Sequence, residues 1–516
     1  MTTSGRHIPN GRVMIMTSLD RRSFMKAAAA TTGGVLVSGA LQTLLAGVAG
    51  AKPPDFFTLN PVADLRANDA LGTDFRVRLH LARGFQYRSF HDTDGPPVVL
   101  HDGTVLPGRH DGMAAFPGPD GNVWLVRNHE LNNPARTALA PQNAFGPGTP
   151  YDVHGLGGTT TVLVTPFGEV LDSFTSLNGT MNNCAGGAMP WGSWISCEET
   201  VNGPDVGPDF TGATNEYLQQ PHGFIYEVPV GQQSNRVPIK SAGRFSHEAA
   251  AYSPEEGIVY LTEDLFGYPS GLYRYVAPSN PMEAGHLEDG GELQMLKVVG
   301  VDQAHLEGAH ANGATYPIEW VVIPNPYPGA DGLFTGLPAN DVAAVFVGDQ
   351  GRAAGAAGFS RLEGATYTRH EIYFTSTQGG GDIESGPQTV VGYGNGAGQV
   401  WSYNPRNSTL TCHYQSPGTS SLDLPDNITA RNNKGTVVLC EDGPVDNYIR
   451  GLTREATLFD IALNRLKRNT SPFAPRHAEE FAGATFSPDG GTLFVNIQAS
   501  QAITFAIWGP WGRLGV

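Results

Sequence analysis

The stretch Gly257 to Asp264 (GIVYLTED) shows the pattern that decides the fold. Apolar residues alternate with others between a glycine turn and two closing acids, which is the period-two pattern of a β-strand. Similar stretches recur at intervals near the roughly 40–50 residues of a propeller blade plus loop insertions, apart from one long gap before His370. They are Gly121 to Glu130 (GNVWLVRNHE), Gly192 to Glu199 (GSWISCEE), His370 to Thr377 (HEIYFTST), Gly435 to Asp442 (GTVVLCED) and Gly491 to Gln498 (GTLFVNIQ).

The repeated stretches predict an all-β fold, a six-bladed β-propeller with loop insertions, in which these six strands lie next to the axis. The long gap contains Val342 to Asp349 (VAAVFVGD), which fits an extra strand or a seventh blade. The chain has 516 residues with 66 Gly and 38 Pro. So many turn residues favour short strands over helix bundles.

Composition also limits the partners. The formal net charge of −17 argues against nucleic acid, because phosphate backbones attract a basic surface. Charged residues make up 16% and aromatic residues 9%, which excludes a coiled coil and an acidic disordered tail. The four cysteines are too few for a disulfide scaffold in so long a chain, although they leave room for one or two pairs.

The N-terminal sequence has the pattern of an export signal. Arg21 and Arg22 precede Ser23-Phe24 and an apolar stretch from Ala27 to Ala49, which resembles a bacterial twin-arginine signal. The alternative, a permanent membrane anchor, is disfavoured by the polar residues and glycines in that stretch. We therefore predict a signal peptide over residues 1–51 and a single propeller domain over residues 52–516. We then expect the twin-arginine export machinery to be a partner, and the mature chain to have no membrane span after cleavage. The expected location is periplasmic or extracellular.

Acidic residues close several of the repeated strands. In a propeller, equivalent strand ends meet at one mouth of the central channel, so these carboxylates would repel one another unless cations bind between them. Oxygen-rich clusters suit hard ions such as Ca²⁺. The alternative is that they are turn acids facing solvent. The residues are Glu130, Glu198, Glu199, Glu263, Asp264, Glu441 and Asp442.

Three further motifs carry chemistry. Cys184, in a glycine-rich loop, is either a thiolate ligand for a transition metal or a small buried residue. Arg361 and Glu363 face the same side of an extended segment, so they could hold a phosphate and a metal or form a surface ion pair. His247-Glu248 looks like a metal-ligand doublet, but neighbours on a strand face opposite sides, so at most one reaches a shared site.

The motifs, taken in order, resemble the PhoX alkaline phosphatase family. The matching blocks cover about residues 75–500 and are Asp111-Gly112-Met113, Asn128-His129-Glu130, Asn183 to Gly187 through Cys197-Glu198-Glu199, Tyr260 to Asp264, Arg361 to Ala365, Pro425-Asp426-Asn427, and Phe486 to Gly490 leading to Asn496-Ile497-Gln498. One departure is Ala499-Ser500-Gln501, where the family typically has His-Pro-Gly.

The resemblance implies an exported β-propeller phosphatase that hydrolyses small-molecule phosphomonoesters with Ca²⁺ and iron, as Fe³⁺. Carried onto this sequence, it implies that Arg361 binds phosphate and, with Glu363, serves catalysis. It further implies that the metal ligands are Cys184 for iron and Glu198, Glu199, Glu263, Glu363, Glu441 and Asp442.

Two rival functions remain open from the sequence. One is a calcium-dependent propeller hydrolase of another class, a lactonase or phosphodiesterase, and the other is a non-catalytic calcium-binding propeller. Neither requires a thiolate-bound iron. The phosphatase hypothesis therefore predicts that Cys184, Glu263 and Glu363 share one metal cluster.

Overall fold

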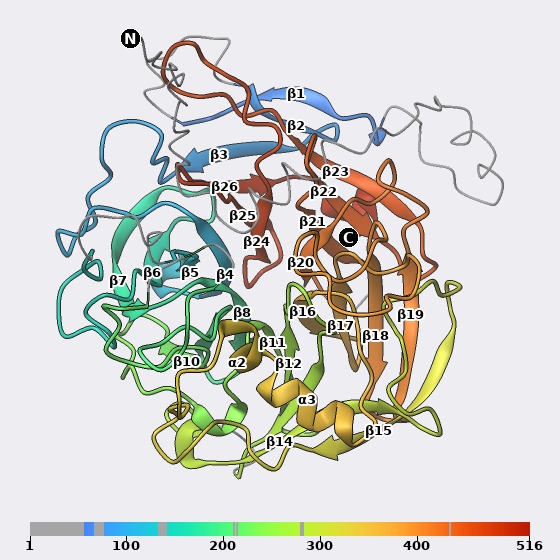
Figure 1. The fold of residues 1–516 in the computed structure, drawn as a ribbon. Helices are drawn as coiled ribbons and strands as arrows, with labels where there is room; N and C mark the ends of the chain where they lie inside the picture. The colour runs from blue at the N-terminus through green and yellow to red at the C-terminus, as the bar shows by residue number, and fades with distance from the viewer. Residues whose placement is uncertain are drawn as a thin grey trace, which may run out of the picture.

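The computed structural model describes residues 56–66, 77–132, 142–209, 212, 215–278, 283–432 and 435–516. Within these residues the chain is a β-propeller, and Figure 1 shows its strands arranged around a central axis. The predicted fold class is confirmed. The predicted signal peptide lies outside the described residues, among which no helix is long and apolar enough to cross a membrane.

Antiparallel groups of strands follow one another along the chain. They are β4 (His110–Pro117), β5 (Val123–His129), β6 (Gly157–Val164) and β7 (Val170–Thr180); β8 (Asn183–Met189), β9 (Ser193–Glu198) and β10 (Ile225–Pro229); β11 (His247–Ser253), β12 (Ile258–Glu263), β13 (Leu272–Val276) and β14 (Glu292–Val298); β16 (Leu362–Thr368), β17 (Glu371–Ser376), β18 (Gln399–Asn404) and β19 (Thr409–Gln415); β20 (Pro425–Ala430), β21 (Val437–Glu441), β22 (Tyr448–Leu452) and β23 (Leu458–Asn464); and β24 (Phe481–Phe486), β25 (Thr492–Ile497) and β26 (Ile503–Trp508).

One strand joins two of these groups. β15 (Thr315–Val322) pairs with β14 on one side and β19 on the other, so both groups belong to one nine-stranded sheet. The number of blades among the described residues therefore depends on how that sheet is divided. Division at β15 gives the predicted six.

The N-terminal part of the domain completes the ring. β3 (Gln86–Phe90) is the fourth strand of the last group and pairs with β26, with Phe90 opposite Thr504 and Gln86 opposite Trp508. β2 (Val77–Leu81) pairs with β23, and β1 (Asn60–Ala63) lies outside β2. Closure by β3 protects the edge of β26, which would otherwise expose unpaired backbone groups.

The strands nearest the axis are not the six that the sequence pattern singled out. β4, β8, β11, β16, β20 and β24 contact one another in this order, and β24 contacts β4 (Figure 1). The predicted strands are β5, β9, β12, β17, β21 and β25, the second strand of each group, so that part of the prediction is wrong. Inner strands such as β8 (NCAGGAM) and β11 (HEAAAYS) consist largely of small residues and show no regular apolar alternation.

The predicted extra strand is also wrong. Val342 to Asp349 lies in two short helices, α2 (Asn340–Ala344) and α3 (Phe346–Ala353). Ala343, Ala344 and Val347 are buried, which places them on one face at the three- and four-residue spacing of a helix. A further helix, α4 (Trp511–Leu514), follows β26.

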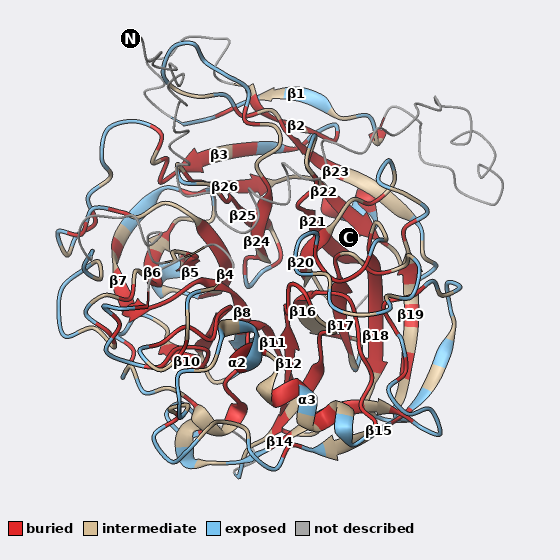
Figure 2. Ribbon diagram, in the orientation of Figure 1, coloured by how far each residue is buried: buried red, intermediate tan, exposed pale blue. Residues whose placement is uncertain are grey.

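Apolar side chains pack between neighbouring groups of strands. Ile195 of β9 and Leu261 of β12 share one buried cluster, and Val400 of β18 and Leu439 of β21 share another. Figure 2 shows buried residues along the strands around the axis, while exposed residues gather on peripheral loops and on β1 and β15. Apolar contacts between neighbouring sheets thus hold the ring together, while polar side chains lie near the axis.

Close approach of the inner strands depends on glycine. A Cβ on Gly112 of β4 would lie 2.5 Å from the Cα of Ala185 in β8. A Cβ on Gly187 of β8 would lie 2.0 Å from the carbonyl oxygen of Ala250 in β11. Both contacts are with backbone atoms that cannot rotate away.

We expect Gly187→Ala to lower the free energy of unfolding by about 1–3 kcal/mol, because the extra methyl group forces two inner strands apart. Urea denaturation measures the change. Gly512→Ala is the control, since nothing lies within 4 Å of its added Cβ. Equal stability of the two variants would contradict the close-packing argument.

Candidate metal centre

A β-bulge occurs at the same place in all six inner strands. The pairing register with the second strand shifts after the first residue of each inner strand in five groups, and after the second in β24. A bulge bends the strand and re-aims the side chain of its extra residue. The first residues within these bulges are Asp111, Cys184, Glu248, Glu363, Asp426 and Gly483.

Four of these bulge residues join acids from other segments in three buried groups. Within each group, one ligand atom of each residue lies within 4.8 Å of those of the other two. The groups share Glu248 and Asp426, so they form one continuous row. The row consists of Cys184, Glu199 and Glu248; then Glu248, Glu363 and Asp426; then Asp426, Asp442 and Glu480.

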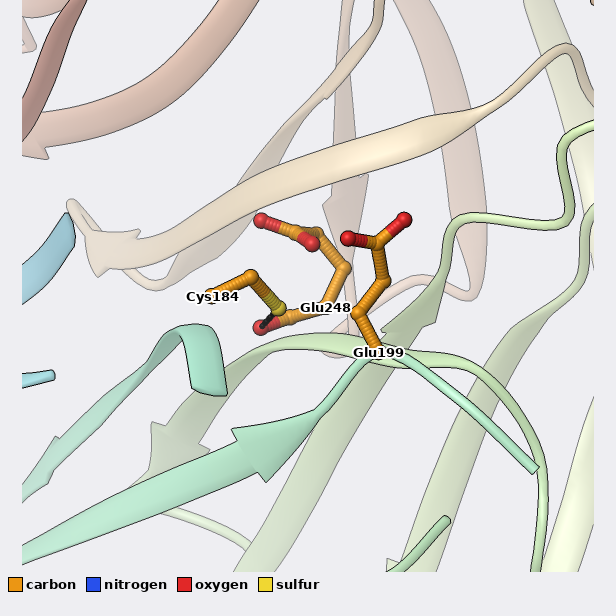
Figure 3. Close-up of side chains that lie close together, drawn as sticks. All are labelled: Cys184, Glu199 and Glu248. Atoms are coloured by element: carbon orange, nitrogen blue, oxygen red, sulfur yellow. Dashed lines mark hydrogen bonds between the residues drawn. The ribbon is translucent and has the colours of Figure 1, made fainter. Parts of the chain in front are cut away.

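The first group combines a thiol with two carboxylates. Figure 3 shows that Cys184, Glu199 and Glu248 come from separate segments and converge on one space. The Sγ of Cys184 lies 3.3 Å from the backbone oxygen of His247 and 3.6 Å from that of Glu248. Burial, followed by the charges of Glu248 and Glu199, raises the pKa of the Cys184 thiol well above its usual value. The thiol therefore needs a bound cation to ionise.

The middle of the row is also unfavourable for negative charge. Burial, followed by the charges of Asp264, Asp426 and Glu248, raises the pKa of Glu363 well above its usual value. Its Oε2 is buried without a hydrogen-bond partner among the described residues. Cations between the carboxylates would remove this repulsion, and thiolate with carboxylate suits iron, whereas all-carboxylate groups suit Ca²⁺. The residues present thus fit both kinds of ion.

Arg361 lies beside the row. Its Nε and Nη2 donate to the two carboxylate oxygens of Asp264 at 3.0 and 2.6 Å, and Nη2 also donates to Glu363 Oε1 at 3.0 Å. Burial alone would lower the pKa of Arg361, but the charges of Asp264 and Glu363 outweigh it and raise the pKa. The guanidinium is therefore a permanent cation held in a fixed orientation.

The structure brings together four of the predicted metal-site residues: Cys184, Glu199, Glu363 and Asp442. Glu198, Glu263 and Glu441 lie outside the groups. Each of these three directly precedes an acid, in the pairs Glu198-Glu199, Glu263-Asp264 and Glu441-Asp442. Neighbours on a strand face opposite sides, so the second acid reaches the axis region and the first points into its own sheet.

The excluded acids have other partners. Glu263 Oε2 accepts hydrogen bonds from the Gly271 amide and the Tyr273 hydroxyl, at 2.8 and 3.0 Å. Glu441 pairs with Arg450 at 2.9 Å. Burial is the main cause that raises the pKa of each glutamate to about 7. Glu263 is thus not among the residues of the row, in which Glu248 stands between Cys184 and Glu363.

Three residues of the row were not predicted as ligands. Glu248 belongs to the His247-Glu248 doublet, which the sequence marked without deciding between its members. Asp426 lies in a block that carried the family resemblance. Glu480 directly precedes β24 and gave no signal in the sequence. The remaining strand-end acid, Glu130, pairs with Arg109 at 2.9 Å.

Glu198 forms hydrogen bonds that fix the segments around Cys184 and Glu199. It accepts hydrogen bonds from the amides of Met181, Gly223 and Phe224, at 2.8–3.1 Å, and its Oε1 lies 2.6 Å from Nδ1 of His222. Nε2 of His222 is 3.6 Å from Asp152. Burial alone would lower the pKa of His222, but Glu198 and Asp152 outweigh it and raise the pKa to about 9.

The raised pKa of His222 predicts a pH-dependent stability. The charged imidazole stabilises the fold fully below its unfolded pKa of about 6.5, and this contribution is lost as the pH rises through about 9. We expect the free energy of unfolding to fall between pH 6.5 and 9.5 in the wild type and to fall less in His222→Gln. Urea titrations across that range measure both. Parallel curves for the two proteins would contradict the charged state of His222.

Comparisons with known proteins point to one family. The fold is similar to that of Pseudomonas fluorescens PhoX in complex with vanadate, a transition state analogue, with a TM-score of 0.58, 17% identity, and coverage of 88% of this chain and 98% of that one. A gluconolactonase from Xanthomonas campestris is less similar, with a TM-score of 0.34, 11% identity, and coverage of 89% and 99%. No curated protein matches the sequence.

The family profile extends over most of the chain. The profile described as alkaline phosphatase PhoX matches residues 67–501, a span that includes every residue of the row and Arg361. The chain therefore belongs to the alkaline phosphatase PhoX family.

Proposed function

We propose that this member of a phosphatase family hydrolyses phosphate monoesters at the row of metal-ligand groups, with iron and calcium as its cofactors. The observation that supports this most is the position of Arg361, which shares Glu363 with the row. A guanidinium beside a chain of cation sites is an arrangement that can bind a phosphate dianion from two sides.

The donor atoms support an assignment of ions to groups. Cys184, Glu199 and Glu248 would hold iron, because a thiolate is a soft ligand. The remaining two groups offer carboxylates alone and would hold Ca²⁺. When bound, these ions supply Lewis-acid stabilisation of a phosphoryl group and of an attacking oxygen.

The protein residues have distinct tasks in this proposal. Arg361 binds the phosphoryl oxygens and stabilises their charge as the ester bond breaks. Asp264 holds the guanidinium through two hydrogen bonds, so that the group keeps one orientation. Glu363 connects Arg361 to the row, so phosphate binding and cation binding occur side by side.

The rival functions lack this support. A calcium-dependent lactonase or phosphodiesterase, or a binding propeller, needs acids at the axis but has no use for a thiol among them. The twin-arginine motif at Arg21 and Arg22 leads us to propose export to the periplasm or the extracellular space. Loading of a thiolate-iron site in the cytoplasm before export would suit that route.

Metal analysis tests the assignment of ions. We expect the purified, exported protein to contain both iron and calcium, and Cys184→Ser to lose iron while it keeps calcium, because an alcohol is a poor substitute for thiolate. Elemental analysis and the absorption of an iron-thiolate centre measure this. Cys412→Ser is the control, since Cys412 is a buried cysteine of β19 outside the three groups. Iron retained in Cys184→Ser would refute the assignment.

Substitution of Arg361 tests the reaction. We expect hydrolysis of a chromogenic phosphomonoester that is lost on chelation and restored by Ca²⁺. Arg361→Ala should lower kcat by a factor on the order of 10²–10³, which is the usual effect of losing one hydrogen-bond donor to the transition state. Arg361→Lys should recover only part, since an ammonium lacks the planar, several-donor geometry of the guanidinium.

A second buried arginine provides a control that separates an effect on stability from an effect on the reaction. Arg78 of β2 also pairs with two carboxylates, Asp64 and Asp92, but lies in the outer part of its sheet. Arg78→Ala should lower the melting temperature and leave kcat near the wild-type value. Wild-type turnover in Arg361→Ala at saturating substrate would refute the role of Arg361. An inert wild type with both metals supplied would favour the rival functions.

A further inference from the structure

The connection between β17 and β18 lies at the end of the ring where the row is found. β16 begins with Leu362 and Glu363 at that end, and β17 runs antiparallel to β16, with Ser376 opposite Leu362. The residues that follow Ser376, up to Gln399, therefore lie at the same end as the row. Within this connection two neighbouring valines are open to solvent: Val390 is 62% exposed and Val391 is 50% exposed.

Hydrogen bonds hold these valines next to Arg361. Nε2 of Gln378 donates to the backbone oxygen of Val391 at 3.1 Å, while Nη1 of Arg361 is 3.5 Å from Oε1 of the same Gln378. A Cβ on the next residue, Gly392, would lie 3.3 Å from Cδ of Arg361. Val391 is thus one residue, and Val390 two residues, from the glycine that packs against the Arg361 side chain.

The same segment is fixed to the loop that carries Asp264. The Gln388 amide donates to the backbone oxygen of Gly267 at 2.8 Å, and the Tyr393 amide donates to that of Phe266 at 2.7 Å. The ring of Phe266 lies 5.7 Å from Cζ of Arg361. Both loops therefore have a defined position around the guanidinium, and each carries apolar residues: Phe266 in one, and Val390 and Val391 in the other.

A phosphate ester bound by Arg361 must extend its organic group away from the row. The row is buried and rich in carboxylates, so it accommodates cations and the phosphate but not a neutral organic group. The loops at the mouth are then the surfaces that this group meets. Exposed single valines are common on proteins, but two together in a segment that packs against a buried arginine form a small apolar surface near that arginine.

We infer that Val390 and Val391 contact the organic group of the substrate and favour phosphate monoesters whose group is apolar next to the ester oxygen, such as alkyl phosphates, over polyhydroxylated ones. This inference rests on the proposed phosphatase function. Apolar contact with an alkyl chain removes surface of both partners from water, whereas a hydroxylated group would lose hydrogen bonds to water without replacement.

The test compares butyl phosphate with glycerol phosphate. For each ester, kcat/KM is measured in the wild type and in the double variant Val390→Ser/Val391→Ser, so that the intrinsic reactivity of the leaving group cancels in the ratio. We expect the double variant to lose about tenfold on butyl phosphate and little on glycerol phosphate. The inhibition constant of inorganic phosphate should stay unchanged, because the phosphate site is intact.

Ile383 provides a matched control in the same connection. It is 61% exposed, but its side chain lies near Gly308 rather than Arg361. Ile383→Ser should leave both esters unaffected. Equal losses on the two esters, or a similar loss on butyl phosphate in Ile383→Ser, would overturn the inference while leaving the phosphatase function in place. Failure of the wild type to hydrolyse either ester, with both metals supplied, would overturn the proposed function and the inference with it.

Discussion

Mutual repulsion among carboxylates buried at the axis is the constraint on which the centre of this molecule depends. The ring brings Glu199, Glu248, Glu363, Asp426, Asp442 and Glu480 into one row, where water cannot screen their charges. Bound cations, or protons in their place, must neutralise the row before the ring is stable. The apolar clusters between neighbouring sheets provide the opposing free energy.

Pairs of adjacent acids divide two tasks between them. In Glu198-Glu199, the second residue joins the row, while the first binds three backbone amides and His222. In Glu263-Asp264, the second residue also faces the axis region, but it binds the side chain of Arg361 and is not part of the row. One strand end can therefore provide a ligand and the support that fixes the ligand's backbone. Metal centres commonly need such supporting contacts to keep their ligands in place.

The sequence predicted the class of fold and the mouth at which the acids gather, because alternation and strand-end acids are both local patterns. It placed the wrong strands at the axis, since the inner strands are short runs of glycine, alanine and polar residues without a regular period. The choice between Glu198 and Glu199, or between His247 and Glu248, depends on strand register. Register at that point is set by the bulge in each inner strand, and a bulge has no sequence signature here. Glu480 could not be found because its position depends on the packing of β24 against its neighbours in the ring.

The closing strand β3 has a consequence for biosynthesis. It is synthesised before its partner β26, from which five groups of strands separate it in the sequence, with Phe90 opposite Thr504. The ring therefore closes only after β26 has been made. The first group draws its residues from 184–248, but Glu480 of the third group directly precedes β24, so the row is complete only when the last group of strands is present. Neutralisation of the whole row is thus tied to closure of the ring.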